Sequence, residues 1–83
     1  MHTYLEKRQP AQKMARFYRM AVMPNLFGEW TLYREWGRIG QGGQVRMDWF
    51  EDENQAVAAL VTLEASKRQR GYWVEPQQLA MFG

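Results

Sequence analysis

Three consecutive residues, Trp36-Gly37-Arg38, place an aromatic ring and a guanidinium on either side of a glycine. In an extended strand, residues two apart point to the same face, so Trp36 and Arg38 can contact one target together. Gly37 has no Cβ, which lets a second backbone or a ligand come close. Flat bases and sugars carried on a polyanion suit this pair. The alternative is structural, because most Trp side chains are largely buried and Arg38 could simply stack on the ring.

A glycine-rich segment, Gly40-Gln41-Gly42-Gly43, follows this triplet. It predicts a hairpin turn in which one or more residues have a positive φ. A phosphate-binding loop of the nucleotide-hydrolase type would continue into Gly-Lys-Ser or Gly-Lys-Thr and a helix, whereas a strand-like stretch follows here. The open amides of this turn, beside Arg38 and Arg46, could nevertheless contact one phosphate.

Alternating apolar and polar residues predict three strands, at residues 16–23, 29–39 and 44–50. A helix follows, because Asp52 and Gln55 have the spacing of a capping box. The helix has an apolar stripe at helical spacing, formed by Ala56, Ala59, Leu60 and Leu63. We therefore expect an α+β fold: a small antiparallel β-sheet of three to five strands with one main α-helix packed on one face.

The second predicted strand does not alternate cleanly. One set of its alternate positions mixes core-like and charged side chains, namely Trp30, Leu32, Arg34, Trp36 and Arg38. A bulge near residues 35–37 would reconcile them, because one extra residue exchanges the two faces of a strand. In the third strand, one face carries Val45, Met47 and Trp49, and the other carries Arg46 and Asp48.

Charged residues also gather at both ends of the predicted helix. Lys67, Arg68 and Arg70 precede Gly71, a residue type that commonly ends helices. Positive charge at this end is favourable to the helix dipole without any ligand, although the three side chains could also extend a basic surface. The acidic residues 51–53 suit the opposite end of the dipole better than they suit a metal site.

The composition excludes several classes of function. The 83 residues include no Cys and a single His, His2, so zinc fingers, thiol catalysis and a two-His metal site are not expected. We expect no cofactor and no membrane span, and a monomer in the cytoplasm, associated with the nucleoid if bacterial. The net charge of +2 hides an asymmetry of +4 in residues 1–40, −4 in 41–66 and +2 in 67–83. This distribution favours a protein that binds anions on one face rather than over its whole surface.

The sequence divides into a mobile basic N-terminal arm (1–15), a folded domain (16–75) and a C-terminal tail (76–83). The tail contains Gln78-Leu79-Ala80-Met81-Phe82, which resembles the peptide by which bacterial DNA polymerases and repair factors bind the sliding clamp. Gln78, Leu79, Met81 and Phe82 are then candidate docking residues. The alternative is that Leu79 and Phe82 pack back on the domain.

The order of these features resembles a known family. The triplet Trp36-Gly37-Arg38, the glycine turn, the strand at 44–50, an alanine-rich helix and Gly71-Tyr72 follow one another as in the WGR domain. This family occurs in poly(ADP-ribose) polymerases and, alone or with other modules, in bacterial proteins. The resemblance covers residues 16–74. It implies a small antiparallel sheet with one helix, and nucleic-acid binding; in the polymerases the domain helps to recognise DNA ends.

We therefore predict a non-enzymatic nucleic-acid-binding module, because no nucleophile–base pair is visible. The expected partner is duplex DNA with little sequence preference, including ends or breaks and a role in repair; the pattern does not separate DNA from RNA. The candidate contacts are Trp36, Gly37, Arg38, Arg34, Arg46, Lys67, Arg68 and Arg70. The alternative is a protein-interaction adaptor, and salt separates the two because phosphate contacts weaken steeply as salt rises.

Overall fold

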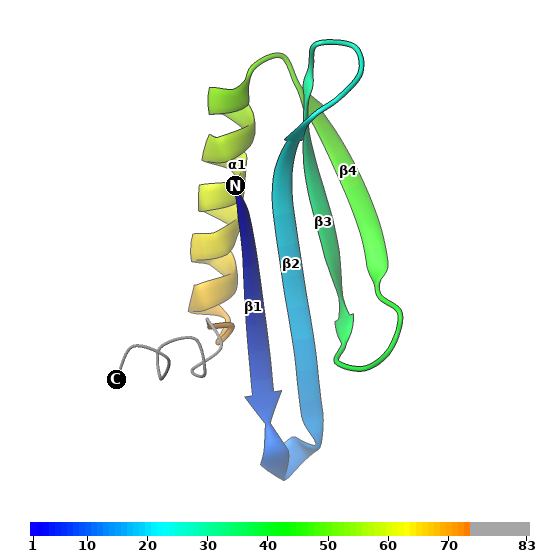
Figure 1. Cartoon of the computed structure of the whole chain (residues 1–83). Coiled ribbons are helices and arrows are strands. Elements are labelled where there is room, and N and C mark those ends of the chain that lie inside the picture. Colours follow the sequence, from blue (N-terminus) through cyan, green and yellow to red (C-terminus); the bar gives the residue numbers. More distant parts are fainter. Residues whose placement is uncertain (74–83) are drawn as a thin grey trace, which may run out of the picture.

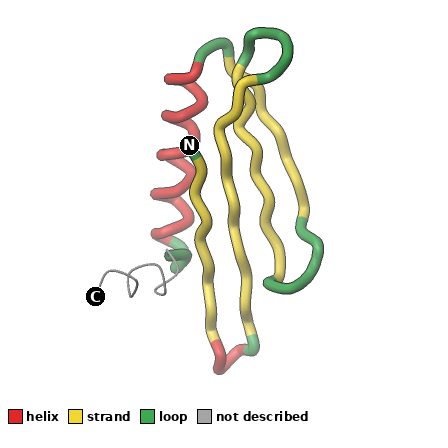
Figure 2. The backbone as a smooth tube through the Cα atoms, in the orientation of Figure 1, coloured by secondary structure: helices red, strands yellow, loops and turns green. Residues whose placement is uncertain are grey.

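The computed structural model describes residues 1–73, which form one antiparallel sheet and a helix (Figure 1). The strands lie side by side in chain order: β1 (His2–Gln9), β2 (Met14–Pro24), β3 (Trp30–Arg38) and β4 (Gln44–Phe50). A short 3-10 helix, η1 (Pro10–Gln12), connects β1 to β2, and the helix α1 (Glu53–Gln69) follows β4. Figure 2 shows the connections alternating between the two ends of the sheet, as in a meander. The α+β class expected from the sequence is confirmed.

The expected bulge near residues 35–37 was wrong. The pairing of β2 with β3 starts at Arg16 opposite Arg38 and continues to the other end without an extra residue. The even-numbered residues of β3 therefore all face α1, charged residues included. Arg34 is accommodated on this face by an ion pair with Asp48 rather than by a reversal of the strand.

The expectation of a mobile arm at residues 1–15 was also wrong, because His2–Gln9 forms the edge strand β1. This strand pairs with β2 along its whole length, from His2 opposite Ala21 to Gln9 opposite Met14. Leu5 is fully buried and anchors the strand in the core. A strand with one large core residue has little apolar periodicity, and most of its stabilisation comes from a backbone ladder that composition does not reveal.

The core lies between the sheet and α1. Its buried members are Leu5, Tyr18, Met20, Val22, Leu32, Ala56 and Leu60. Asp52 caps α1, accepting a hydrogen bond from the backbone N–H of Gln55 at 2.9 Å, as the capping-box spacing predicted. No helix within residues 1–73 is long and apolar enough to cross a membrane.

The other face of the sheet has no helix over it. Three apolar side chains of β4 stand on that face: Val45 is 50% exposed, Met47 53% and Trp49 67%. Met23 of β2 is exposed on the same face. The two faces therefore differ in kind, since one holds the core and the other displays an apolar stripe along an edge strand.

Candidate nucleic-acid interface

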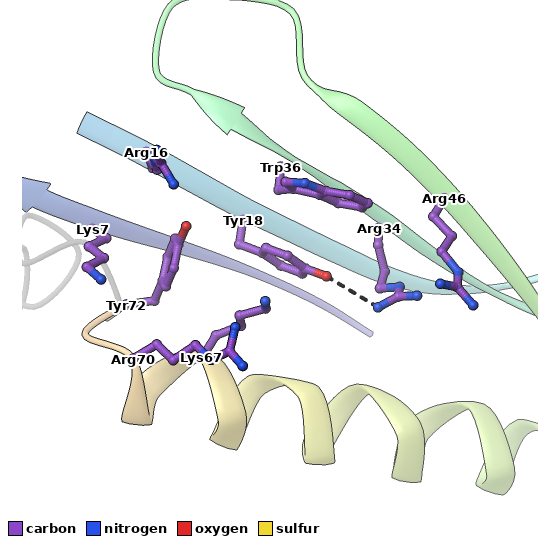
Figure 3. Close-up of a pocket in the computed structure, with 9 residues that line it drawn as sticks. All are labelled: Lys7, Arg16, Tyr18, Arg34, Trp36, Arg46, Lys67, Arg70 and Tyr72. Atoms are coloured by element: carbon purple, nitrogen blue, oxygen red, sulfur yellow. Dashed lines mark hydrogen bonds between the residues drawn. The ribbon is translucent and has the colours of Figure 1, made fainter. Parts of the chain in front are cut away.

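A cleft of about 470 Å³ lies between the helix-facing side of the sheet and the C-terminal end of α1 (Figure 3). We call it the basic cleft. Nine residues line it: Lys7, Arg16, Tyr18, Arg34, Trp36, Arg46, Lys67, Arg70 and Tyr72. They come from all four strands, from α1 and from the segment after it, and all but the three aromatic residues are cationic.

The register of the sheet brings these side chains together. Residues opposite one another on neighbouring strands share a face, so this side of the sheet carries cross-strand rows two residues apart. The aromatic row consists of Tyr18 and Trp36. The row on one side of it contains Lys7, Arg16 and Arg38. The row on the other side contains Arg34 and Arg46. The strand pairing thus places an aromatic row between two basic rows.

The three aromatic rings of the basic cleft pack on one another. Tyr18, which is buried, stacks on Trp36 with ring centroids 5.6 Å apart and an angle of 13° between the planes. The ring of Tyr72 meets Tyr18 edge-on at 6.2 Å. Trp36 is partly buried, so it packs on the core and also lines the cleft.

The end of α1 places Tyr72 in this cluster. Gly71 adopts a φ of +96°, and the N–H of Tyr72 donates to the carbonyl of Lys67 at 3.0 Å while the N–H of Gly71 donates to that of Arg68. These two bonds make a Schellman motif, in which a left-handed residue reverses the chain at the end of a helix. Gly71 thus turns the chain so that Tyr72 points back to the sheet.

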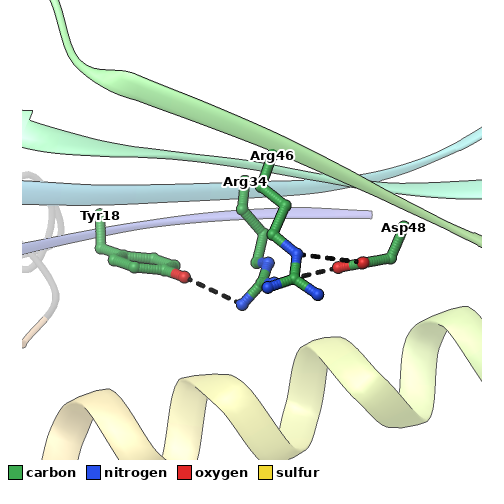
Figure 4. A network of polar contacts seen from close by, with 4 residues as sticks. All are labelled: Tyr18, Arg34, Arg46 and Asp48. Atoms are coloured by element: carbon green, nitrogen blue, oxygen red, sulfur yellow. Dashed lines mark hydrogen bonds and ion pairs between the residues drawn. The ribbon is translucent and has the colours of Figure 1, made fainter.

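A polar network closes one end of the basic cleft (Figure 4). Asp48 accepts hydrogen bonds from Nη2 of Arg34 at 3.0 Å and from Nε of Arg46 at 3.2 Å. Arg34 also reaches the hydroxyl of Tyr18 at 3.5 Å, and its side chain is only 13% exposed. One carboxylate therefore serves two guanidinium groups, which leaves this end of the cleft with a net positive charge.

The remaining cations of the basic cleft have no ion pair within residues 1–73. They are Lys7, Arg16, Lys67 and Arg70. The ammonium of Lys67 lies 4.6 Å from the centre of the Tyr18 ring. Desolvation, followed by the charges of Arg70 and Arg34, lowers the pKa of Lys67 from its ordinary value of 10.5. These groups are held close together without counter-charge, and an anion entering the cleft would supply it.

A second hollow of about 340 Å³ adjoins the basic cleft at Trp36. We call it the turn hollow. It shares Arg16, Trp36 and Tyr72 with the basic cleft, and its other lining residues are Gly37, Arg38, Gln41, Gly42, Gly43 and Gln44. The exposed guanidinium of Arg38 thus lies next to the glycine turn and on the same side of the sheet as Trp36, as the two-residue spacing predicted.

Two glycines of this region, Gly37 and Gly43, are required by close backbone approach. A Cβ on Gly37 would lie 3.0 Å from the Cα of Gly43, and one on Gly43 would lie 2.6 Å from the carbonyl oxygen of Trp36. Gly40 has a φ of +86°, so the prediction of a positive φ in the turn is confirmed. The backbone of the triplet therefore packs directly against the backbone of the glycine turn, and this contact fixes the position of Trp36.

The family model of the WGR domain matches residues 1–78 of this chain. The chain belongs to the WGR domain family. A curated relative, the uncharacterized protein y4dW of Sinorhizobium fredii, is 45% identical over 73 residues. The alignment covers 88% of this chain and 36% of y4dW, so the chain spans about a third of the length of that relative. No solved structure matches. WGR domains are generally nucleic-acid-binding modules, and the match includes β1, which the sequence resemblance had left out.

The structure of the WGR domain brings together most of the candidate site residues. Arg34, Trp36, Arg46, Lys67 and Arg70 line the basic cleft, and Gly37 and Arg38 line the turn hollow. Arg68 lines neither hollow, and its guanidinium pairs with Glu64 at 3.6 Å one turn earlier on α1. The candidate docking residues Gln78, Leu79, Met81 and Phe82 lie outside the described residues.

Four cleft residues were missed from the sequence: Lys7, Arg16, Tyr18 and Tyr72. Lys7 was assigned to the mobile arm, and Tyr18 was predicted only to lie on one face of the strand at residues 16–23. The signal that could have found Arg16 and Tyr18 is register, since a hairpin that sets Tyr18 opposite Trp36 also sets Arg16 opposite Arg38. For Tyr72 the available signal was Gly71, because a helix-ending glycine turns the next residue back over the fold.

Proposed function

We propose that the basic cleft and the turn hollow bind duplex DNA, with little sequence preference and with a preference for ends or breaks. The observation that carries this proposal is the aromatic row of Tyr18 and Trp36 between two basic rows. Cations on both sides suit phosphates, and Trp36, the accessible member of the aromatic row, suits the sugar or base between them. We further propose that the domain is a binding module without catalytic activity of its own.

The size and continuity of the surface favour a polymer over a small anion. The basic cleft alone has a volume of about 470 Å³, and the turn hollow extends it past Trp36. Rows two residues apart along a strand are separated by about 7 Å, so the two basic rows lie about 13 Å apart. A single phosphate would reach one basic row, whereas a sugar-phosphate strand would reach both.

The position of α1 argues against reading of base sequence. Its buried residues Ala56 and Leu60 hold it on the sheet, and its first turn is acidic, with Asp52 as cap and Glu53 after it. Sequence-specific recognition usually inserts a helix or a β-ribbon into the major groove. The acidic first turn would repel the phosphates beside a groove, and the cations of the basic cleft lie at the other end of α1. We therefore expect the contacts to fall on phosphates, which position DNA without specifying its sequence.

The preference for ends rests on Trp36. This ring stands where the two hollows meet, and part of it remains accessible although Tyr18 supports it. Inside a duplex, base faces are already stacked on their neighbours. A terminal nucleotide or one beside a break has a free face for an aromatic ring, and its terminal phosphate adds charge for the surrounding cations.

The proposal is tested by measuring duplex affinity as a function of salt. Each phosphate neutralised contributes about −0.9 to the slope of log K against log salt. The four cleft cations that have no ion pair among residues 1–73 therefore predict a slope of about −3 to −4. Arg70→Ala should reduce the magnitude of this slope by about 0.9. Arg68→Ala is the matched control: Arg68 lies two residues away, it is also exposed at the end of α1, and its replacement should leave the slope nearly unchanged because it pairs with Glu64 and lines neither hollow. A slope near zero, or equal effects of the two variants, would refute the proposal.

The preference for ends is tested separately by competition. A duplex with 5′-phosphorylated ends should displace a labelled duplex more effectively than the same duplex with hydroxyl ends, and a closed circular duplex should compete least. Single-stranded DNA and RNA of equal length provide the comparison of nucleic-acid classes. Equal competition by linear and circular duplexes would remove the end preference and leave the binding proposal standing.

A further inference from the structure

The outer edge of β4 is open and apolar. Within residues 1–73, β4 pairs with β3 alone, and its outer edge lies on the side of the sheet farthest from α1 in Figure 1. Val45, Met47 and Trp49 line this edge on the helix-free face, each at least half exposed. The opposite edge of the sheet differs, because the backbone of Glu6 on β1 exchanges hydrogen bonds of 2.8 and 2.9 Å with Trp73.

The strand lacks most of the devices that keep edge strands from pairing. Such devices include proline, lysine, a bulge or a very short strand. β4 is seven residues long, contains neither Pro nor Lys, and pairs with β3 without a bulge. Its charged residues are Arg46 and Asp48, which have opposite signs and lie two residues apart. An edge of this kind can accept another strand if that strand sets an opposite charge beside each of the two.

We propose that the partner strand is β4 of a second copy of this chain, paired antiparallel about a two-fold axis through Met47. The sequence of β4 is self-complementary in this register. Its cross-strand pairs are Val45 with Trp49, Met47 with Met47, Arg46 with Asp48, and Gln44 with Phe50. Aromatic–β-branched pairs and opposite-charge pairs are the kinds that stabilise neighbouring strands. Within one chain Asp48 pairs with Arg34 and with the exposed Arg46. In the proposed dimer Arg46 would pair with Asp48 of the second copy, while Arg34 keeps its pair with Asp48 of its own chain.

Other registers are disfavoured by charge and by the strand pleat. A shift that moves the axis to Arg46 sets two guanidinium groups opposite each other, and one that moves it to Asp48 opposes two carboxylates. Both also pair fewer residues of β4. A change by a single position would match the apolar face of one copy with the charged face of the other, because side chains alternate between faces. The register centred on Met47 pairs all seven residues and opposes no like charges.

The proposed dimer has a defined architecture. A two-fold axis perpendicular to the sheet joins the two four-stranded sheets into a continuous eight-stranded one and keeps corresponding faces on the same side. Both copies of α1 and both basic clefts then lie on one face. Arg46 belongs to the cleft and to the paired strand, so the two clefts are neighbours across the axis. This inference replaces the monomer expected from the sequence and does not depend on what the cleft binds.

Sedimentation equilibrium of the full chain tests the inference. The wild type should give about twice the 9.9 kDa of one chain. Met47→Glu brings two carboxylates together at the axis and should give a monomer that melts like the wild-type fold at low concentration. Val61→Glu is the matched control, since Val61 is 49% exposed on α1 and Met47 is 53% exposed on β4; it should remain dimeric. A monomeric wild type, or a Met47→Glu variant as dimeric as the control, overturns the proposal.

Cysteine cross-linking tests the register, and the chain contains no Cys of its own. Directly opposite residues have Cβ atoms about 4.5–5.5 Å apart, so Met47→Cys should form a disulfide-linked dimer under mild oxidation with diamide. Val45→Cys alone should not, because the two copies of residue 45 lie about 13 Å apart along the strands. A mixture of Val45→Cys and Trp49→Cys chains should cross-link as a heterodimer. Efficient cross-linking of Val45→Cys alone, with none for Met47→Cys, overturns the register.

Discussion

Replacing Trp36 separates its role in the fold from its role in binding. The structure gives this side chain both, because it packs against the core through Tyr18 and also stands between the two hollows. Trp36→Ala should therefore lower both the stability of the domain and its affinity for DNA. The question is whether the loss of affinity exceeds what the damaged fold accounts for.

The loss of stability can be bounded from the packing. Truncating a fully buried Trp costs about 3–5 kcal/mol, but part of Trp36 borders open hollows, so its removal does not create a closed cavity. The stacked pair with Tyr18 contributes about 0.5–1.5 kcal/mol beyond buried area. We expect a decrease of about 1–2 kcal/mol in the free energy of unfolding, and each kcal/mol lowers the Tm by roughly 4–8 °C in a domain of this size.

The expected loss of binding is of similar size but has a different origin. Stacking of an aromatic side chain on a base is worth about 1–3 kcal/mol, which corresponds to a roughly 5- to 150-fold weaker affinity for a duplex end. Thermal unfolding and duplex titration of the same preparations measure the two effects. The titration must be made well below the Tm of the variant, so that the fraction of unfolded protein does not enter the affinity.

Trp30 offers a matched control on the same strand. It lies on the same face of β3, it is partly buried against the same core, and it lines neither hollow. Trp30→Ala should lower the Tm by a comparable amount and leave duplex affinity unchanged, whereas Trp36→Phe should recover much of the stability by keeping a ring on Tyr18. Equal losses of affinity in Trp30→Ala and Trp36→Ala would show that Trp36 acts only as scaffold.

Two further variants address the turn and the charge of the cleft. Gly43→Ala should lower the free energy of unfolding by about 1–3 kcal/mol, because its Cβ would lie 2.6 Å from the Trp36 carbonyl oxygen. Gly42 has open space around it, so Gly42→Ala should change the free energy of unfolding by no more than about 1 kcal/mol. Thermal melts of the two variants measure both changes. Lys67→Met should raise the Tm at neutral pH and weaken DNA binding. The pKa of Lys67 is lowered in the folded state, so the folded protein holds this proton less tightly than the unfolded chain, and the gain from Lys67→Met should fade as the pH rises from the lowered pKa toward 10.5. A Tm for Lys67→Met below that of the wild type at neutral pH would contradict this account of Lys67.

Elements with strong local signals were predictable from the sequence. The helix begins at its expected cap, because the hydrogen bond between Asp52 and Gln55 spans a single turn. The glycine turn was predictable because glycine readily adopts a positive φ, as Gly40 does in the structure. Such features depend on a few neighbouring residues, so no knowledge of the rest of the fold is needed to predict them.

Features that depend on distant partners were not predictable. β1 is stabilised by a backbone ladder with β2, and its own side chains give almost no sign of it. Arg34 looked misplaced among core residues because its partner, Asp48, lies on another strand. Lys7 and Arg70 are far apart in the chain and meet only because β1 and the end of α1 border the same cleft. In each case the missing information was which strand lies beside which, and in what register.

Burial explains why Arg34 is paired while several exposed cations of the cleft are not. Arg34, whose side chain is 13% exposed, pairs with Asp48 and shares that carboxylate with Arg46, because an unpaired buried charge would cost the fold too much stability. Arg16 and Arg70 are exposed, so water can solvate them and the fold has no need to pair them. Lys67 is partly buried, and desolvation followed by the charges of Arg70 and Arg34 lowers its pKa. Within the part of the chain that the structure describes, the cleft cations without an ion pair are therefore ones that a ligand can reach. The pair of Arg34 and Asp48 instead stabilises the sheet beside Tyr18 and Trp36.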